Sequence, residues 1–290
     1  MHSLMYVKKV LNLSTFFVSV FYLLLLSTPS HALNNSSANC STGLTKHHQT
    51  PAHPRKKAHV KWVYDGDTLK LSGSTKKNPN STKLRVIGID TPEKAHKPNY
   101  KKSEPFAGQA TEALRELLSK HDNTIYYEEG RQNKDKYGRL LAYVFTPDGI
   151  DVSQWLLQQG LATILIIPPN NRYIDCYRKA EKQAQEKALN IWSLAENKVT
   201  NVADLSSKTR GYVRLKGTVK RIKRRKNKIS ITLDHQIYIT IKKPDLGLFT
   251  NLDVANLKGK SIQVAGILYR HGKKGYIRVR HPVYIETIND

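Results

Sequence analysis

Residues 58–72 read AHVKWVYDGDTLKLS. Apolar and aromatic side chains recur in 58–64 and again in 67–72, and the turn-forming pair Asp65-Gly66 lies between them. This pattern predicts two strands joined by a tight turn. Similar stretches, rich in Val, Ile, Leu and Tyr, predict further strands at 83–89, 123–129 and 139–146.

Helical patterns lie between and after these strands. Alanines and leucines recur at helical spacing in 105–119, and Pro105 suits a first helical turn. A short helix is predicted at 151–159, and a long amphipathic helix is predicted at 171–189. Five strands with helices packed beside them indicate a small α+β barrel domain over 58–193.

A second set of strands follows a polar segment, 194–210, which we interpret as a linker. An insert at Pro244–Leu252 separates the third of these strands from the fourth. Five strands with an insert at that point predict a second, OB-fold-like β-barrel domain over 211–290. Its strands are expected at 212–224, 228–233, 236–242, 260–270 and 275–287.

The N-terminus has the pattern of a signal peptide. Lys8 and Lys9 precede an apolar run over 10–26, and Ser30-His31-Ala32 offers small residues for cleavage after Ala32. An uncleaved membrane anchor is the alternative, but the small-residue site favours cleavage. We therefore expect a signal peptide over 1–32, a flexible linker over 33–57, and a secreted or periplasmic protein without a membrane segment after cleavage.

The chain is strongly basic and contains few cysteines. A formal net charge of +25 over 290 residues indicates a polyanionic partner, which could be nucleic acid, a membrane surface or an acidic polysaccharide. An oxidising compartment permits a bridge between the two cysteines, Cys40 and Cys176, but the sequence leaves their pairing open. It also leaves the oligomeric state open, with a monomer as our expectation.

Three short motifs lie within 58–145. Each alone is compatible with an ordinary turn or strand end. They are Asp65-Gly66-Asp67-Thr68, Arg85-Val86-Ile87-Gly88-Ile89-Asp90-Thr91-Pro92-Glu93 and Asp135-Lys136-Tyr137-Gly138-Arg139.

Together the motifs supply the groups needed to cleave a phosphodiester. Asp67 and Asp90 offer oxygens to a hard divalent cation, which suits Ca²⁺ and also other divalent ions. Arg85 and Arg139 can bind phosphate oxygens through paired N–H donors. Glu93, just beyond a strand, can position or deprotonate a water molecule.

These motifs, in this order, resemble the signatures of the staphylococcal nuclease family. Pro169-Asn170-Asn171 and the later Leu189-Asn190-Ile191-Trp192 resemble the same family, so the resemblance extends over about 58–193. It implies an OB-type barrel with three helices, and hydrolysis of DNA and RNA with little sequence preference to leave 3′-phosphates.

The resemblance also implies a role for each matched residue. Calcium would be held by Asp67, Asp90 and the Thr91 carbonyl, and Glu93 would act as general base or water-positioning group. Phosphate binding and transition-state stabilisation would fall to Arg85 and Arg139, and a terminal phosphate would be seated by Lys136 and Tyr137.

One segment departs from the family's pattern. The family's type enzyme has tyrosines in its nucleotide pocket ahead of the Pro-Asn-Asn motif, whereas 163–169 here reads TILIIPP, with Leu165 and Ile167 at the aligned positions. Without the phenols, base stacking should weaken or change, while the hydrolytic groups remain.

The 211–290 region is denser in positive charge than the rest of the chain. It has 18 Lys and Arg against 5 Asp and Glu. Basic clusters at 220–228 and 270–280 alternate with tyrosines, which predicts contact with nucleic acid, although some tyrosines must pack the barrel. The tyrosines are Tyr212, Tyr238, Tyr269, Tyr276 and Tyr284.

The leading hypothesis is therefore a nuclease. A catalytically impaired nucleic-acid-binding protein is the alternative, but the presence of both arginines and all three carboxylates argues against it. A basic protein that binds anionic polymers in general is a third hypothesis.

Overall fold

The structure is a computed structural model that describes residues 54–73, 83–95, 102–250 and 252–288. The predicted signal peptide, its cleavage site and nearly all of the predicted 33–57 linker lie outside the described residues. Within the part that is described, no helix is long and apolar enough to cross a membrane.

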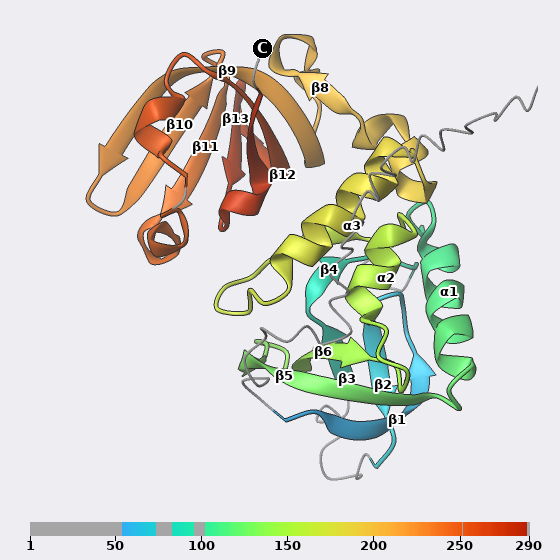
Figure 1. Cartoon of the computed structure of the whole chain (residues 1–290). Coiled ribbons are helices and arrows are strands. Elements are labelled where there is room, and N and C mark those ends of the chain that lie inside the picture. The colour runs from blue at the N-terminus through green and yellow to red at the C-terminus, as the bar shows by residue number, and fades with distance from the viewer. Residues whose placement is uncertain (1–53, 74–82, 96–101, 251, 289–290) are drawn as a thin grey trace, which may run out of the picture. The chain divides into compact units, whose positions relative to one another are not determined.

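The first domain is built on a closed barrel of five strands (Figure 1). Neighbouring strands follow the order β1-β2-β3-β6-β5, and the β3–β6 pair is parallel whereas the other pairs are antiparallel. The predicted barrel is thereby confirmed. The strands are β1 (Lys56–Val63), β2 (Thr68–Leu71), β3 (Lys83–Val86), β5 (Thr124–Lys134) and β6 (Leu140–Phe145).

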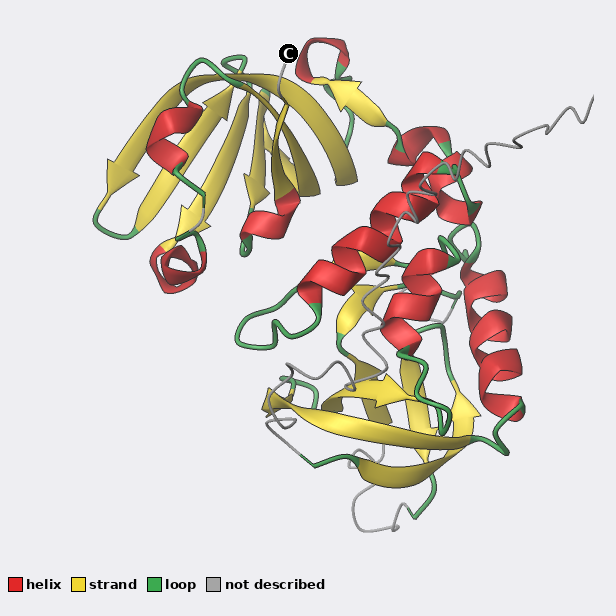
Figure 2. Ribbon diagram, viewed as in Figure 1, coloured by secondary structure: helices red, strands yellow, loops and turns green. Residues whose placement is uncertain are grey.

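Three helices accompany this barrel, and α2 packs between α1 and α3 (Figure 2). They are α1 (Ala107–Ser119), α2 (Val152–Gln158) and α3 (Ile174–Glu186). The expected apolar face of α3 is buried through Tyr177, Ala180 and Ala184. The helices and the barrel share one core. Because α3 packs into this core, the segment before it is held close to the barrel strands.

The predicted strand over 83–89 is divided at Gly88. This residue has φ +96°, and a side chain there would overlap the Tyr177 ring, so only glycine fits. The chain leaves the barrel at this point and forms β4 (Gly88–Asp90), which pairs antiparallel with β7 (Thr163–Leu165).

The second domain is also a closed barrel, with the strand order β9-β10-β11-β13-β12 and a final β12–β9 pairing. Its parallel pair is β11–β13, so its third and fifth strands pair as those of the first barrel do. The OB-fold-like prediction is confirmed. The strands are β9 (Gly211–Arg225), β10 (Lys228–Leu233), β11 (Ile237–Lys242), β12 (Ser261–His271) and β13 (Lys274–Arg278).

Two sequence expectations need correction at the edges of this domain. The segment 194–210 is more than a linker, because β8 (Val199–Asn201) pairs with β9, and Val202 is buried in the second core. The strand expected over 275–287 ends at Arg278, and a helical turn at Pro282–Tyr284 precedes β14 (Ile285–Ile288). Both differences arise from long-range pairing, which local residue patterns do not encode.

Cys176 lies in α3 and is disulfide-bonded, whereas Cys40 lies outside the described residues.

Candidate active site

The β2–β3 pairing places the first two motifs next to each other. Thr68 pairs with Arg85, and the backbone N–H of Val86 donates to the carbonyl of Asp67 at 2.8 Å. The first residue of the Arg-to-Glu motif therefore lies beside the second aspartate of the Asp-Gly-Asp-Thr motif.

Arg85 connects the two aspartates that the sequence singles out. Its Nη1 lies 3.0 Å from Oδ2 of Asp67, and its Nη2 lies 2.8 Å from Oδ1 of Asp90. Nη1 also donates to the carbonyls of Val86 and Ile89, each at 2.9 Å. The side chain is only 11% exposed, so the guanidinium is fixed by its surroundings.

Asp67 is buried and accepts several hydrogen bonds. The backbone N–H of Thr91 donates to its Oδ2 at 3.0 Å, and the hydroxyl of Thr68 donates to its Oδ1 at 3.1 Å. Burial raises the pKa of Asp67, and Arg85 opposes that rise. Burial also raises the pKa of Asp90, and the positive charge of Arg85 again opposes that rise. The two carboxylates thus share one counter-charge, with Asp67 buried and the Asp90 side chain about half exposed.

The donor set at this place fits a hard cation. Asp67 and Asp90 supply carboxylate oxygens on either side of one guanidinium, and the backbone of Thr91, whose N–H donates to Asp67, adds a carbonyl oxygen. Oxygen donors are those preferred by Ca²⁺ and Mg²⁺, and water completes such sites where the protein supplies few ligands. Across the described ranges, however, no group of three His, Cys, Asp or Glu side chains gathers into a metal cluster. The fit therefore rests on two carboxylates and a carbonyl.

Glu93 is held at the same edge of the barrel by a residue that the sequence analysis did not single out. Oε2 of Glu104 accepts a hydrogen bond from the backbone N–H of Glu93 at 2.9 Å, and the Glu104 N–H donates to the Glu93 carbonyl at 2.9 Å. The charge of Glu104 also contributes to the raised pKa of Asp90. Glu104 therefore ties the backbone of Glu93 to the neighbourhood of the carboxylate pair.

Arg139 is oriented by Asp135, the first residue of its own motif. Nε of Arg139 lies 2.6 Å from Oδ2 of Asp135, and Oδ1 of Asp135 accepts the backbone N–H groups of Tyr137 and Arg139, each at 2.9 Å. These bonds hold the pKa of Asp135 below its usual value, although partial burial acts against them. The positive charge of Arg139 also opposes the rise in the pKa of Asp90. The sequence analysis did not predict this pair, which its i,i+4 spacing across the Gly138 turn could have indicated.

Lys136 and Tyr137 lie on the outside of the same turn. Tyr137 is 64% exposed, and Nζ of Lys136 lies 4.8 Å from the centre of its ring. Both side chains are accessible to a ligand that approaches Arg139. Their role in seating a terminal phosphate remains a prediction.

The segment before α3 is attached to β5 through two side chains. Asn170 is buried, and its amide accepts from the N–H of Gln132 at 3.1 Å and donates to the Gln132 carbonyl at 2.9 Å. The fully buried Glu128 accepts from Arg172 at 2.7 Å and from the Tyr173 hydroxyl at 2.8 Å. The Pro-Asn-Asn motif therefore has a structural function here.

Segment 163–169, which differs from the family's sequence pattern, presents an aliphatic surface. Ile167 is 47% exposed, whereas Leu165 is half-buried in β7. An exposed isoleucine offers no ring for base stacking and no hydroxyl for phosphate, in keeping with the expected change in nucleotide binding.

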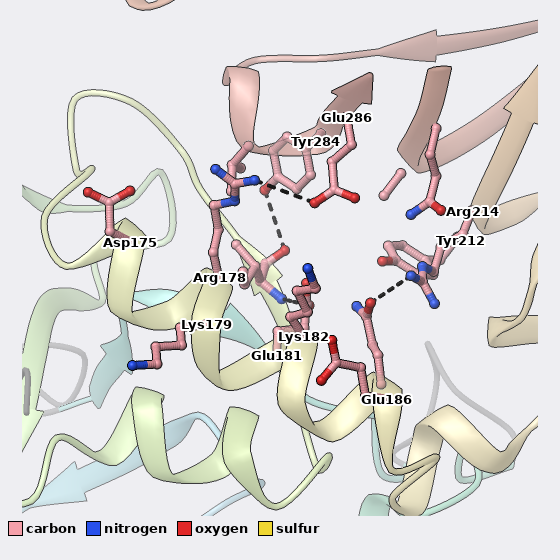
Figure 3. A pocket seen from close by; sticks show the side chains of 15 residues that line it. Asp175, Arg178, Lys179, Glu181, Lys182, Glu186, Tyr212, Arg214, Tyr284 and Glu286 are labelled. Carbon is pink, nitrogen blue, oxygen red and sulfur yellow. Dashed lines mark hydrogen bonds and ion pairs between the residues drawn. The ribbon is translucent and has the colours of Figure 1, made fainter. Parts of the chain in front are cut away.

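A pocket of about 580 Å³ lies away from these motifs (Figure 3). It is lined by α3 and by strands of the second barrel, and it contains equal numbers of basic and acidic side chains. None of the predicted catalytic, metal or phosphate residues lines it. Its balanced charge makes it a poor phosphate site. The charged residues are Arg178, Lys179, Lys182, Arg214, Asp175, Glu181, Glu186 and Glu286.

Comparison with known proteins gives consistent matches over the first domain. The family described as "Staphylococcal nuclease homologue" matches residues 83–194, a range that begins after Asp67. The chain is 38% identical to a thermonuclease of Staphylococcus intermedius over 133 residues, which are 46% of this chain and 74% of that protein. It is 36% identical to the thermonuclease of Staphylococcus hyicus over 131 residues, 45% of this chain and 72% of the other.

Longer relatives match over the same extent. An SPbeta prophage-derived endonuclease of Bacillus subtilis is 39% identical over 130 residues, 44% of this chain and 41% of that protein. A second B. subtilis endonuclease, YncB, is 38% identical over 130 residues and 58% of its own length. The chain therefore spans only about half the length of these two curated relatives.

Proposed function

Because this chain belongs to the staphylococcal nuclease family, we propose that it is a nuclease that hydrolyses phosphodiester bonds of DNA and RNA with low sequence preference. The observation that carries this proposal is the single guanidinium of Arg85 bound to both Asp67 and Asp90. Residues from separate segments of the chain meet there.

We further propose that Ca²⁺ is the cofactor, held by Asp67, Asp90 and the Thr91 carbonyl. The bound cation supplies positive charge beside the scissile phosphate, where negative charge accumulates in the transition state. The all-oxygen donor set supports a hard cation, and the choice of calcium follows the family resemblance.

The side chains of this protein then have distinct tasks. Arg85 has five N–H donors, so it can hold both carboxylates and still donate to a phosphate oxygen. Arg139 is held through Nε by Asp135 and binds phosphate with its two terminal nitrogens. Glu93 positions or deprotonates the attacking water, and the P–O bond to the 5′ oxygen breaks to leave a 3′-phosphate.

The compartment is part of the same proposal. The signal-peptide pattern and its cleavage site after Ala32 favour release to the periplasm or the medium, where calcium is available to the enzyme. Mass spectrometry of protein recovered from the culture medium and from the periplasm tests this. A mature N-terminus at Leu33 is expected, and an intact Met1 terminus in the membrane fraction would contradict it.

The activity is tested on oligonucleotides labelled at the 5′ end. Mature protein should cut single-stranded DNA and RNA in the presence of Ca²⁺, stop with chelator, and leave products that need phosphatase before a polymerase can extend them. Salt-dependent binding without any turnover would instead identify a catalytically impaired nucleic-acid-binding protein.

A further inference from the structure

The second barrel carries three tyrosines in one row. They come from three neighbouring strands, β11, β13 and β12 (Figure 1). Tyr238 of β11 pairs with Tyr276 of β13, and Tyr276 also pairs with Tyr269 of β12. Residues directly opposite on paired strands point to the same face of a sheet. The register alone therefore aligns the three side chains.

The row lies on the outer face of the barrel. The strand neighbours of these tyrosines, among them Ile237, Ile277 and Leu268, are buried in the core, so the tyrosines alternate outward. The Tyr238 and Tyr276 rings are stacked, with centroids 5.3 Å apart and an angle of 21° between their planes. Tyr269 continues the row with 62% of its surface exposed.

The other two tyrosines of this domain have different surroundings. The hydroxyl of Tyr284 accepts the backbone N–H of Ile166 at 2.6 Å, and the ring packs against the first core. Tyr212 lines the pocket of Figure 3 instead. The expectation that some tyrosines are structural is thus met by these two residues, and three remain on the surface.

Positive charge surrounds this tyrosine row. Nζ of Lys274 lies 5.8 Å from the centre of the Tyr238 ring, and the row continues across β10 to Arg221 of β9. Outward positions next to the row on these strands include Lys223 and Arg278, and Arg278 is itself paired with Asp245. The β9–β10 hairpin and the β12–β13 hairpin at the ends of the strands are basic as well.

Aromatic rings beside lysine and arginine side chains match one class of polymer best. A single nucleic-acid strand offers unpaired bases that stack on tyrosine and phosphates that pair with Lys and Arg. A duplex hides its base faces, and a neutral glycan would gain nothing from the basic hairpins. The β9–β10 and β12–β13 hairpins correspond to the loops that OB-folds use for oligonucleotides, and Tyr238 lies on the third strand, which belongs to the face they use.

We propose that Tyr238, Tyr276 and Tyr269 form a stacking surface for bases of single-stranded DNA or RNA, with Arg221, Lys223 and Lys274 beside the phosphates. The second barrel would hold a strand independently of the first. The proposal extends the function proposed above to a second site, but it does not need that site to be catalytic.

The test measures binding of full-length mature protein to a fluorescent dT oligonucleotide by anisotropy, in chelator and in a Glu93→Gln background. Hydrolysis is absent under these conditions, so a failure of the nuclease proposal does not affect the result. Tyr269→Ala should weaken binding about 5- to 150-fold, as expected for one lost stacking contact. Tyr269→Phe is the matched control and should bind within twofold of the parent.

Charge is tested separately with Arg221→Ala, which should lower the slope of log affinity against log salt by about one. Lys258→Ala, an exposed lysine of the same domain outside the row, is the control for a general loss of charge. Retention of the parent thermal transition by Tyr269→Ala excludes unfolding as the cause.

Three results would overturn the proposal. Unchanged binding by Tyr269→Ala, equal affinity for the duplex form of the oligonucleotide, or equal loss in Tyr269→Ala and Tyr269→Phe each contradicts stacking. If heparin displaces the oligonucleotide equally well from the parent and from Tyr269→Ala, and both proteins bind the oligonucleotide equally, the surface binds polyanions in general instead.

Discussion

Replacement of Arg85 by lysine should impair both the stability of the first domain and its activity. The guanidinium contacts Asp67 at 3.0 Å, Asp90 at 2.8 Å and two backbone carbonyls at 2.9 Å, and it is only 11% exposed. One ammonium group cannot reach both carboxylates and both carbonyls. If two of the four contacts are lost, the free energy of unfolding should fall by about 3–6 kcal/mol, because hydrogen bonds to charged groups contribute about 1.5–3 kcal/mol each.

Arg85→Lys should also lose activity while it is still folded, because Arg85 is expected to contact the phosphate. Removal of a preorganised donor to the transition state lowers kcat about 100- to 1000-fold. Initial rates on denatured DNA with saturating Ca²⁺ should therefore fall at least about 100-fold at a temperature where Arg85→Lys is fully folded.

Unfolding can be followed for this domain alone. The three tryptophans, Trp62, Trp155 and Trp192, all lie in the first domain, so urea titration by tryptophan fluorescence reports on it. Arg178→Lys in α3 is the matched control, since Arg178 is half exposed and contacts the equally exposed Glu286 at 3.4 Å, so this variant should lose less than about 1 kcal/mol. The reasoning is refuted if Arg85→Lys unfolds like the parent and retains its kcat within twofold.

Three further substitutions test other contacts. Asp135→Asn removes the charge that orients Arg139, so kcat should fall about tenfold with little change in KM, and unchanged kcat would show that Asp135 is dispensable. Glu128→Gln leaves two arginines without their buried carboxylate and should lower the urea-derived free energy of unfolding by about 3–5 kcal/mol; a change below about 1 kcal/mol contradicts this. Burial raises the pKa of Asp151 from 3.8 to about 6. As pH rises, the Asp151 carboxyl ionises at a lower pH in the unfolded chain than in the folded one. The free energy of unfolding should therefore fall by up to about 3 kcal/mol between about pH 4 and pH 6, and the whole decrease should be present above pH 6. Urea titrations across this range should show a smaller fall in Asp151→Asn, and an identical pH profile would exclude this assignment.

The sequence predicted those parts of the fold that depend on local pattern. Alternation over 58–72 and helical spacing over 171–189 matched β1, β2 and the core of α3. The division of the 83–89 strand was not predicted, because the apolar run continues through Gly88 and only Tyr177, 89 residues later, shows why glycine is needed there.

The candidate site was predictable in composition but not in its internal connections. Arg85 was expected to bind phosphate, and the structure adds that it links Asp67 to Asp90. Glu104 and Glu128 gave no sequence signal, because their partners come from other segments of the chain. The alignment of the surface tyrosines likewise depends on strand register, which the sequence did not specify.

The central claim is that Glu93 acts on the attacking water in a calcium-dependent phosphodiester hydrolysis. The most direct measurement is kcat of Glu93→Gln on denatured DNA with saturating Ca²⁺, beside parent protein with Ca²⁺ and with chelator. Glu93→Gln should lower kcat by about 100-fold or more and retain oligonucleotide binding, and the parent should be inactive in chelator. Parent-like turnover by Glu93→Gln, or full parent activity in chelator, would contradict it.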